Sequence, residues 1–140
     1  MKFRTAIIDT NVVVAGLLTH VVDSPTARIL DAMLEAGFVY LLSTELVAEY
    51  RQVLWRPVIR KLHRLTSTQI DQILVKIVTN AVIREPACSS TTAPEPGDQH
   101  LWDLMACEPG TVLVTGDRKL VKTPPDGASV LSPAAFVEQM

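Results

Sequence analysis

Short apolar runs that are almost free of charge constrain the fold of this chain more than any other feature. They occupy residues 3–9, 38–42 and 111–115, with smaller candidates at residues 81–84 and 129–131. Such runs predict buried strands, and the segments between them have helical spacing. Hydrophobic strands that alternate with helices form parallel sheets covered on both faces. We therefore expect an α/β fold: a central, mostly parallel sheet of four to five strands, helices on both faces, and one domain over residues 1–140.

Polar residues at the start of each apolar stripe indicate where the helices begin. Serine, threonine and asparagine are favoured there, and proline suits the first helical position. The expected N-caps are Thr10 or Asn11, Ser24, Ser43 or Thr44, Thr66 in a capping box with Gln69, and Ser132. We also expect a glycine stop at Gly37, a loop over residues 86–97 and a helix over residues 98–107.

Composition excludes several classes of protein. Hydrophobic residues make up 48% of the chain and charged residues 20%, so a core is expected and disorder is not. No apolar run approaches the roughly 20 residues of a membrane span, and residues 1–9 lack the apolar region of a signal peptide. Cys88 and Cys107 are too few for a disulfide framework or a zinc site. We expect a cytoplasmic protein in which both cysteines are free thiols.

Carboxylates follow the ends of the predicted strands. Asp9 ends the first strand, and Asp117 follows the strand at residues 111–115 after one glycine. Asp98 opens the helix that leads to that strand, and Glu49 lies in the helix after the second strand. The carboxyl ends of parallel strands share one edge of a sheet, and ligands bind there. We therefore expect these carboxylates to converge from separate elements.

Each of these carboxylates also has a purely structural interpretation. Asp9 and Asp117 are suited to capping the next helix or turn, and Asp98 to the first turn of a helix. Like charges crowded at one edge, however, destabilise a fold unless a cation offsets them. Oxygen ligands without histidine or cysteine suit Mg²⁺ or Mn²⁺, which leave room for water and a substrate phosphate. Metal-assisted phosphodiester hydrolysis is the natural chemistry of such a site.

The same residues carry a resemblance to a known family. The motifs are Ile8-Asp9-Thr10-Asn11, Ser43-Thr44-Glu45-Leu46 leading to Glu49-Tyr50, Glu95-Pro96-Gly97-Asp98 with Leu101, and Val114-Thr115-Gly116-Asp117. With these motifs in this order, the chain resembles the PIN-domain ribonucleases, in particular the bacterial toxin components of toxin–antitoxin pairs. The resemblance covers nearly the whole chain.

The resemblance implies an activity and a set of site residues. It implies an endoribonuclease that uses one or two Mg²⁺ or Mn²⁺ ions in an acidic site. The metal ligands and catalytic residues that it implies are Asp9, Glu49, Asp98 and Asp117. The residues that would orient the carboxylates or the bound water are Thr10, Asn11 and Thr115.

The chain departs from the family pattern at one place. This branch often has a run of aspartates before the late helix, where this chain has Gly97 and Gln99. Asp103, further along that helix, is a candidate for a carboxylate that supports the metal ligands without binding the metal.

The resemblance also implies partners. They are an RNA substrate, a cognate antitoxin and a second copy of the chain, docked through the apolar residues in 46–55 and 58–65.

A run of basic residues is a further candidate for function. Residues 51–70 contain no acidic residue, although the net charge of the chain is −2. The run comprises Arg51, Arg56, Arg60, Lys61 and Arg64. A charge run is most often a solvated helix face, but beside an acidic pocket it would hold an RNA backbone. The family resemblance favours RNA binding.

Two other functions stay open. A haloacid-dehalogenase-like phosphatase would use Asp9 as a covalent nucleophile, but such an enzyme needs an aspartate where this chain has Asn11. A non-catalytic module would use the acidic edge to dock a basic partner, and its binding would not depend on Mg²⁺ or Mn²⁺. The histidines at 20, 63 and 100 are too dispersed for a metal site, and we expect structural or surface roles for them.

Overall fold

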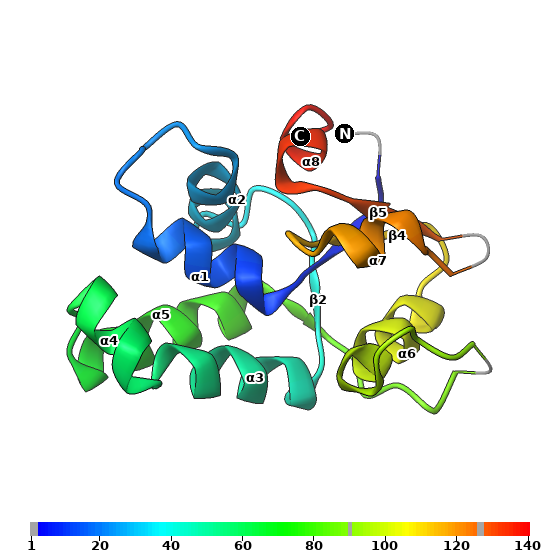
Figure 1. Ribbon diagram of the computed structural model, residues 1–140, viewed down its shortest axis with the longest axis horizontal. Helices are drawn as coiled ribbons and strands as arrows, with labels where there is room; N and C mark the ends of the chain where they lie inside the picture. Colours follow the sequence, from blue (N-terminus) through cyan, green and yellow to red (C-terminus); the bar gives the residue numbers. More distant parts are fainter. Residues whose placement is uncertain (1–2, 90, 126–127) are drawn as a thin grey trace.

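Short parallel strands form the centre of the fold, which the computed structural model describes for residues 3–89, 91–125 and 128–140 (Figure 1). The strands are β1 (Thr5–Ile8), β2 (Leu41–Leu42), β3 (Val82–Ile83), β4 (Thr111–Val114) and β5 (Ser129–Leu131). One ladder has the order β1–β4–β5, and a second pairs β2 with β3. All of these pairs are parallel. A bridge between Ala6 and Tyr40 joins the two ladders.

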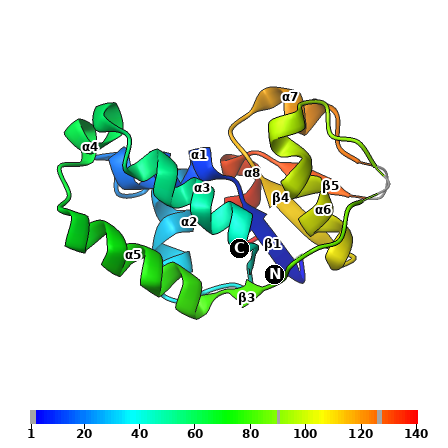
Figure 2. The ribbon, with the colours of Figure 1, turned by 90° about the horizontal axis from the view of Figure 1, so that it is seen from below.

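Helices cover both faces of this joined sheet, whose order is β3–β2–β1–β4–β5. The first group is α1 (Thr10–Leu18), α2 (Pro25–Leu34), α3 (Thr44–Leu54), α4 (Pro57–His63) and α5 (Ser67–Asn80). After β3 come the 3-10 turn η1 (Pro96–Asp98), α6 (Gln99–Cys107), α7 (Arg118–Lys122) and α8 (Pro133–Val137). Figure 2 shows α1 to α5 on one side of the sheet and α6 with α7 on the other. The expected α/β fold with a parallel sheet is therefore confirmed.

The core lies on both sides of β1 and β4. Ile7 and Ile8 of β1 and Leu113 and Val114 of β4 are fully buried, which explains why these runs carry no charge. At Gly16, α1 and α2 come so close that a Cβ atom would lie 2.5 Å from the Thr26 carbonyl oxygen. Glycine is therefore required where the two helices cross.

Aromatic side chains close the amino end of the sheet. The Phe3 and Phe136 rings lie 4.6 Å apart between centroids, and Phe38 packs edge-on against Phe136 at 5.2 Å. Next to them, the buried Tyr40 hydroxyl donates to the Ile77 carbonyl at 2.6 Å, which ties β2 to α5. Burial raises the pKa of Tyr40 to about 12.

Most of the expected helix caps are present. The side chains of Ser24, Ser43 and Ser132 each accept a hydrogen bond from the backbone of the helix that they open. Thr66 and Gln69 form the expected capping box. The structure corrects one cap: α1 begins at Thr10 with Asp9 as its N-cap, not Thr10 or Asn11. The reason is that Asp9 Oδ1 accepts a hydrogen bond from the Thr10 amide at 2.8 Å.

Other expectations are corrected in detail. The run at residues 38–42 pairs as a strand only at Leu41–Leu42, since Tyr40 forms a single bridge. The left-handed residue after α2 is Ala36, with φ of 55°, rather than Gly37. Cys88 and Cys107 are free thiols, as expected, and both are exposed. Ser90, in the predicted loop, lies outside the described residues. In the part of the chain that is described, no helix is long and apolar enough to cross a membrane.

Candidate active site

β1 and β4 are neighbours in the middle of the sheet, so their carboxyl ends lie side by side. From β1 the chain adds β2 and β3 on one side, whereas from β4 it adds β5 on the other, so the strand order changes direction between β1 and β4. Ile8 and Val114 are paired, and the Asp9 amide donates to the Val114 carbonyl at 2.9 Å. Asp9 and Thr115 therefore follow the two strands at the same level. In open α/β sheets, the crevice at such a reversal is where ligands bind.

A hydrogen-bond network holds Asp9 in place. Its Oδ2 accepts from the Thr115 hydroxyl at 2.8 Å and from Asn11 Nδ2 at 3.3 Å. Asn11 Oδ1 in turn accepts from the Gly116 amide at 2.9 Å, and Thr115 Oγ1 accepts from the Asp117 amide at 3.0 Å. The network joins the start of α1 to the turn after β4, so Asp9 and Asp117 are positioned by the same contacts.

A pocket of about 450 Å³ opens at this point. It is lined by Asp9, Thr10, Asn11, Val14, Ala15, Leu18, Glu49, Val53, Arg56, Asp98 and Asp117. The expected convergence of carboxylates from β1, α3, the start of α6 and the turn after β4 is therefore observed. Thr115 contacts Asp9 from behind, whereas Asp103 is not among the lining residues.

Capping accounts for part of this acidic cluster. Asp9 caps α1, and Asp117 caps α7 by accepting from the Lys119 amide at 2.9 Å. Asp98 is the N-cap residue of α6 but makes no side-chain cap bond, and Glu49 is inside α3. The structural interpretation therefore holds for Asp9 and Asp117, but does not account for the position of Asp98 and Glu49 beside them.

The carboxylates repel one another in the described structure. Burial is the main cause that raises the pKa of Asp9, with the charge of Glu49 adding to it, whereas hydrogen bonds from Thr115 and Thr10 oppose the shift. Burial also raises the pKa of Asp98, and the charges of Asp9, Asp117 and Glu49 raise it further. Negative charge therefore accumulates in this pocket, where the basic neighbours of the four carboxylates are Arg56 and His100.

A histidine that sequence reasoning did not connect with the site contacts one of its carboxylates. His100 Nε2, on α6, lies 2.8 Å from Glu49 Oε2, on α3. The spacing of His100 from Asp98 gave no signal of this contact, because the partner belongs to a different helix. His100 is a buried residue with 8% of its surface exposed.

Asp103 serves a different part of the molecule from the expected one. Its Oδ1 accepts from the Ser89 amide at 2.8 Å and from Gln99 Nε2 at 3.0 Å. Gln99 also accepts from the Ala93 amide at 2.8 Å. Together, Gln99 and Asp103 fasten the loop that follows β3 to α6. These hydrogen bonds turn Asp103 toward the loop rather than toward the pocket.

The basic run is divided between three places. Arg56 lines the acidic pocket. The guanidinium groups of Arg60 and Arg51 lie 4.8 and 5.8 Å from the centre of the Trp55 ring, and Arg51 also lies 4.0 Å from Asp71. Lys61 and Arg64 are exposed at the end of α4. Arg56 is therefore the member of the run that contacts the same space as the carboxylates.

The oxygen-rich pocket fits a divalent cation that keeps several water ligands better than a cation whose ligands all come from the protein. Among the residues described, no three histidine, cysteine, aspartate or glutamate side chains are close enough to hold a metal ion together. Mg²⁺ and Mn²⁺ commonly keep several waters and use one or two carboxylates. Thr10 Oγ1 is buried in the pocket wall and has no hydrogen-bond partner within the described ranges, which leaves a polar group for a bound water.

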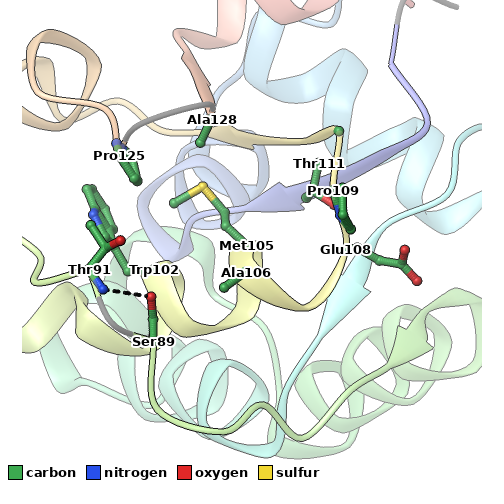
Figure 3. A pocket seen from close by; sticks show the side chains of 11 residues that line it. Ser89, Thr91, Trp102, Met105, Ala106, Glu108, Pro109, Thr111, Pro125 and Ala128 are labelled. Atoms are coloured by element: carbon green, nitrogen blue, oxygen red, sulfur yellow. Dashed lines mark hydrogen bonds between the residues drawn. The ribbon is translucent and has the colours of Figure 1, made fainter.

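A second pocket, of about 190 Å³, lies at the amino end of β4 (Figure 3). Trp102, Met105 and Ala106 of α6 form one wall, and Pro125 and Ala128 lie opposite. Its lining carboxylate, Glu108, pairs with Arg84 at 3.5 Å, and the Thr91 amide donates to Ser89 Oγ at 3.1 Å. Among the residues that the structure describes around it, no group of carboxylates converges, so the pocket at the carboxyl end is the candidate active site.

Comparison with known proteins is consistent with this location. Among curated proteins, none matches the chain. The family model for the PIN domain matches residues 5–119, which contain all four pocket carboxylates. PIN domains are generally nucleases, typically use divalent metal ions and act on nucleic acids. On this match, the chain belongs to the PIN domain family.

Proposed function

We propose that this PIN domain is a Mg²⁺- or Mn²⁺-dependent endoribonuclease and the toxin component of a toxin–antitoxin pair. The observation that supports the activity is the lining of one pocket by Asp9, Glu49, Asp98 and Asp117 at the reversal of the sheet order. The toxin role is supported by the resemblance of the motifs around these residues to the toxin branch of the family.

The carboxylates would hold the cation, and their neighbours would hold the carboxylates. When bound, the divalent ion lowers the pKa of a coordinated water and offsets negative charge on the phosphate. Thr115 and Asn11 keep Asp9 oriented through hydrogen bonds to Oδ2. Thr10 Oγ1, unpartnered in the described part of the pocket wall, is available to bind a water. No side chain is required to act as a nucleophile.

RNA would enter past Arg56, which shares the pocket with the carboxylates. Its guanidinium suits a phosphate next to the one that is cleaved. Arg51 and Arg60, stacked on Trp55, and Lys61 and Arg64, on α4, would extend this cationic surface along the RNA backbone. The phosphatase alternative is disfavoured because Asn11, which bonds to Asp9 and to the Gly116 amide, stands where such an enzyme needs its second aspartate.

The toxin role also implies protein partners. Val58 and Leu62, one turn apart on α4, are 70% and 60% exposed, so this helix presents apolar surface to solvent. Exposed apolar surface of this kind marks interaction sites. We propose that α3 and α4 contribute to a homodimer and that a cognate antitoxin binds the folded domain.

The first experiment combines RNA cleavage with thermal unfolding, for the wild type and for Asp9→Asn. Wild type should cleave RNA with Mg²⁺ or Mn²⁺ and not with chelator, and the variant should not cleave. The ion should stabilise the wild type by about 2.7 kcal/mol at a hundredfold excess over its dissociation constant, and the variant much less.

Either of two results would count against the proposal. Cleavage that persists in the Asp9→Asn variant would remove Asp9 from the mechanism and leave it as a helix cap. Equal stabilisation of both proteins by the ion would show that Asp9 is not a ligand. Binding of a basic partner that is indifferent to the ion, without cleavage, would support the non-catalytic module instead.

A further inference from the structure

The imidazole of His100 connects helices that lie on opposite faces of the sheet. His100 belongs to α6, whereas Glu49 belongs to α3, and the two side chains meet at 2.8 Å between Nε2 and Oε2. The His100 side chain is 7% exposed and that of Glu49 is 35% exposed. The contact therefore links a half-exposed carboxylate of the pocket to a buried group beside Asp98.

Glu49 depends on this contact for its position. Within the described residues, its carboxylate has no other polar partner. The side chain has several rotatable bonds, and the charges of Asp9 and Asp98 act against it across the pocket. A glutamate in that situation gains by turning its carboxylate toward solvent, where water screens the repulsion. The hydrogen bond from the imidazole opposes that movement.

Packing alone does not explain a histidine here. His100 Nδ1 is buried and has no hydrogen-bond partner in the ranges that the structure covers. A buried polar atom without a partner costs stability, and an apolar side chain of similar volume would avoid that cost. Unlike an apolar residue, histidine has an Nε2–H group, and this group reaches Glu49.

We propose that His100 is a positioning residue: it donates from Nε2 to Glu49 and keeps that carboxylate turned toward the acidic pocket. This inference rests on the proposed function, because a divalent cation is the ligand that the positioned carboxylate would receive. It does not require His100 to contact the cation or the RNA. Outer groups that orient metal ligands in this way commonly contribute 10- to 100-fold to metal affinity.

Two amide variants of His100 separate its hydrogen bond from its bulk. In His100→Gln the side-chain NH₂ group replaces Nε2, so the donor to Glu49 is kept. In His100→Asn the NH₂ group corresponds to Nδ1 and stops short of Glu49. The probe is Mn²⁺ alone, titrated by calorimetry into the full chain without RNA. Thermal unfolding in chelator reports whether each variant is folded, and His100→Leu replaces the asparagine variant if the latter is unfolded.

The expected result is a difference between the two variants. His100→Asn should weaken Mn²⁺ binding by about 10-fold or more, whereas His100→Gln should stay within about threefold of the wild type. In a Glu49→Gln background, His100→Asn should cause no further loss, because the carboxylate that it positions is gone. A role of His100 in stability alone would not show this dependence on Glu49.

Three results would overturn the inference. Equal weakening by the asparagine and glutamine variants would show that the Nε2 contact is not responsible. Wild-type affinity in a folded asparagine or leucine variant would show that Glu49 needs no support, and the proposed function would stand. A wild type that binds no Mn²⁺ would overturn the proposed metal dependence, and this inference with it.

Discussion

The pockets at the two ends of the parallel sheet differ in the arrangement of their charged side chains. At the carboxyl end, Asp9, Glu49, Asp98 and Asp117 share one space. At the amino end, Glu108 pairs with Arg84, and the hydroxyl groups of Thr5 and Thr111 bond to each other. Carboxylates therefore cluster at the carboxyl end, with Arg56 and His100 as basic neighbours, whereas Glu108 at the amino end is paired singly with an arginine.

Helix direction explains why carboxylates gather at one end. Asp9, Asp98 and Asp117 are the N-cap residues of α1, α6 and α7. The positive ends of these helices reduce the cost of placing negative charges near one another. The amino-end pocket instead receives the carboxyl-terminal turns of α6, which offer carbonyl oxygens. The topology thus supplies support for an acidic site at only one of the two ends.

Exchanging one carboxylate at each end gives the largest expected effect. Asp117→Asn should reduce RNA cleavage by at least about 100-fold, because it removes a proposed metal ligand. Glu108→Gln should leave cleavage unchanged, since it breaks only the pair with Arg84. Initial rates at saturating Mg²⁺ measure both. A comparable loss in the Glu108 variant would show that the two ends are not functionally distinct.

Exchanging two arginines, one in the acidic pocket and one paired with Glu108, gives an intermediate effect. Arg56→Gln should weaken binding of single-stranded RNA roughly tenfold, as expected for the loss of one charge-assisted contact. The slope of log K against log salt should also fall by about 1. Arg84→Gln, whose guanidinium pairs with Glu108 outside the acidic pocket, should change neither quantity. Fluorescence anisotropy with an uncleaved RNA in chelator measures both, and an unchanged slope for Arg56→Gln would favour a solvated helix face.

The smallest effect concerns stability without metal. Because burial raises the pKa of Asp9 above its ordinary value of 3.8, the folded protein holds this proton more tightly than the unfolded chain. The stabilisation from Asp9 is therefore complete below pH 3.8 and is lost as the pH rises through the folded pKa. In chelator at pH 7, the free energy of unfolding of Asp9→Asn should therefore be higher than that of the wild type.

The pH series distinguishes this effect from a general one. The advantage of Asp9→Asn should shrink as the pH is lowered from 7, because Asp9 takes up its proton at a higher pH in the folded protein than in the unfolded chain. Glu108→Gln is the matched control for the loss of a carboxylate outside the acidic pocket. Chemical denaturation at each pH gives the difference, and a constant offset would contradict the role assigned to burial of Asp9.

Features set by local rules could be predicted from the sequence. Ser43 and the capping box of Thr66 and Gln69 are present as expected, because a cap depends on residues only three positions apart. The convergence of Asp9 and Asp117 was predictable because parallel strands place their carboxyl ends together. Tyr40 shows where such rules fail. The sequence pattern predicts a strand that includes Tyr40, but its ring packs in the aromatic cluster and its backbone forms only a bridge.

Contacts between helices were not predictable from spacing along one helix. His100 meets Glu49, which belongs to another helix, so counting residues from Asp98 could not reveal it. Asp103 lies five residues after Asp98, which is about 140° around a helix, and it faces the loop after β3. The short helix at Arg118–Lys122 was also missed, since a single turn carries too few apolar positions to show a period.

The hydrogen bond between Thr115 and Asp9 joins residues separated by 106 positions in the chain. During synthesis, the first strand and its aspartate leave the ribosome long before the strand that completes their surroundings. At about 5–20 residues per second, that delay lasts several seconds. The acidic pocket therefore cannot assemble until translation has passed Asp117, and a polypeptide interrupted before that point carries the aspartate without the site.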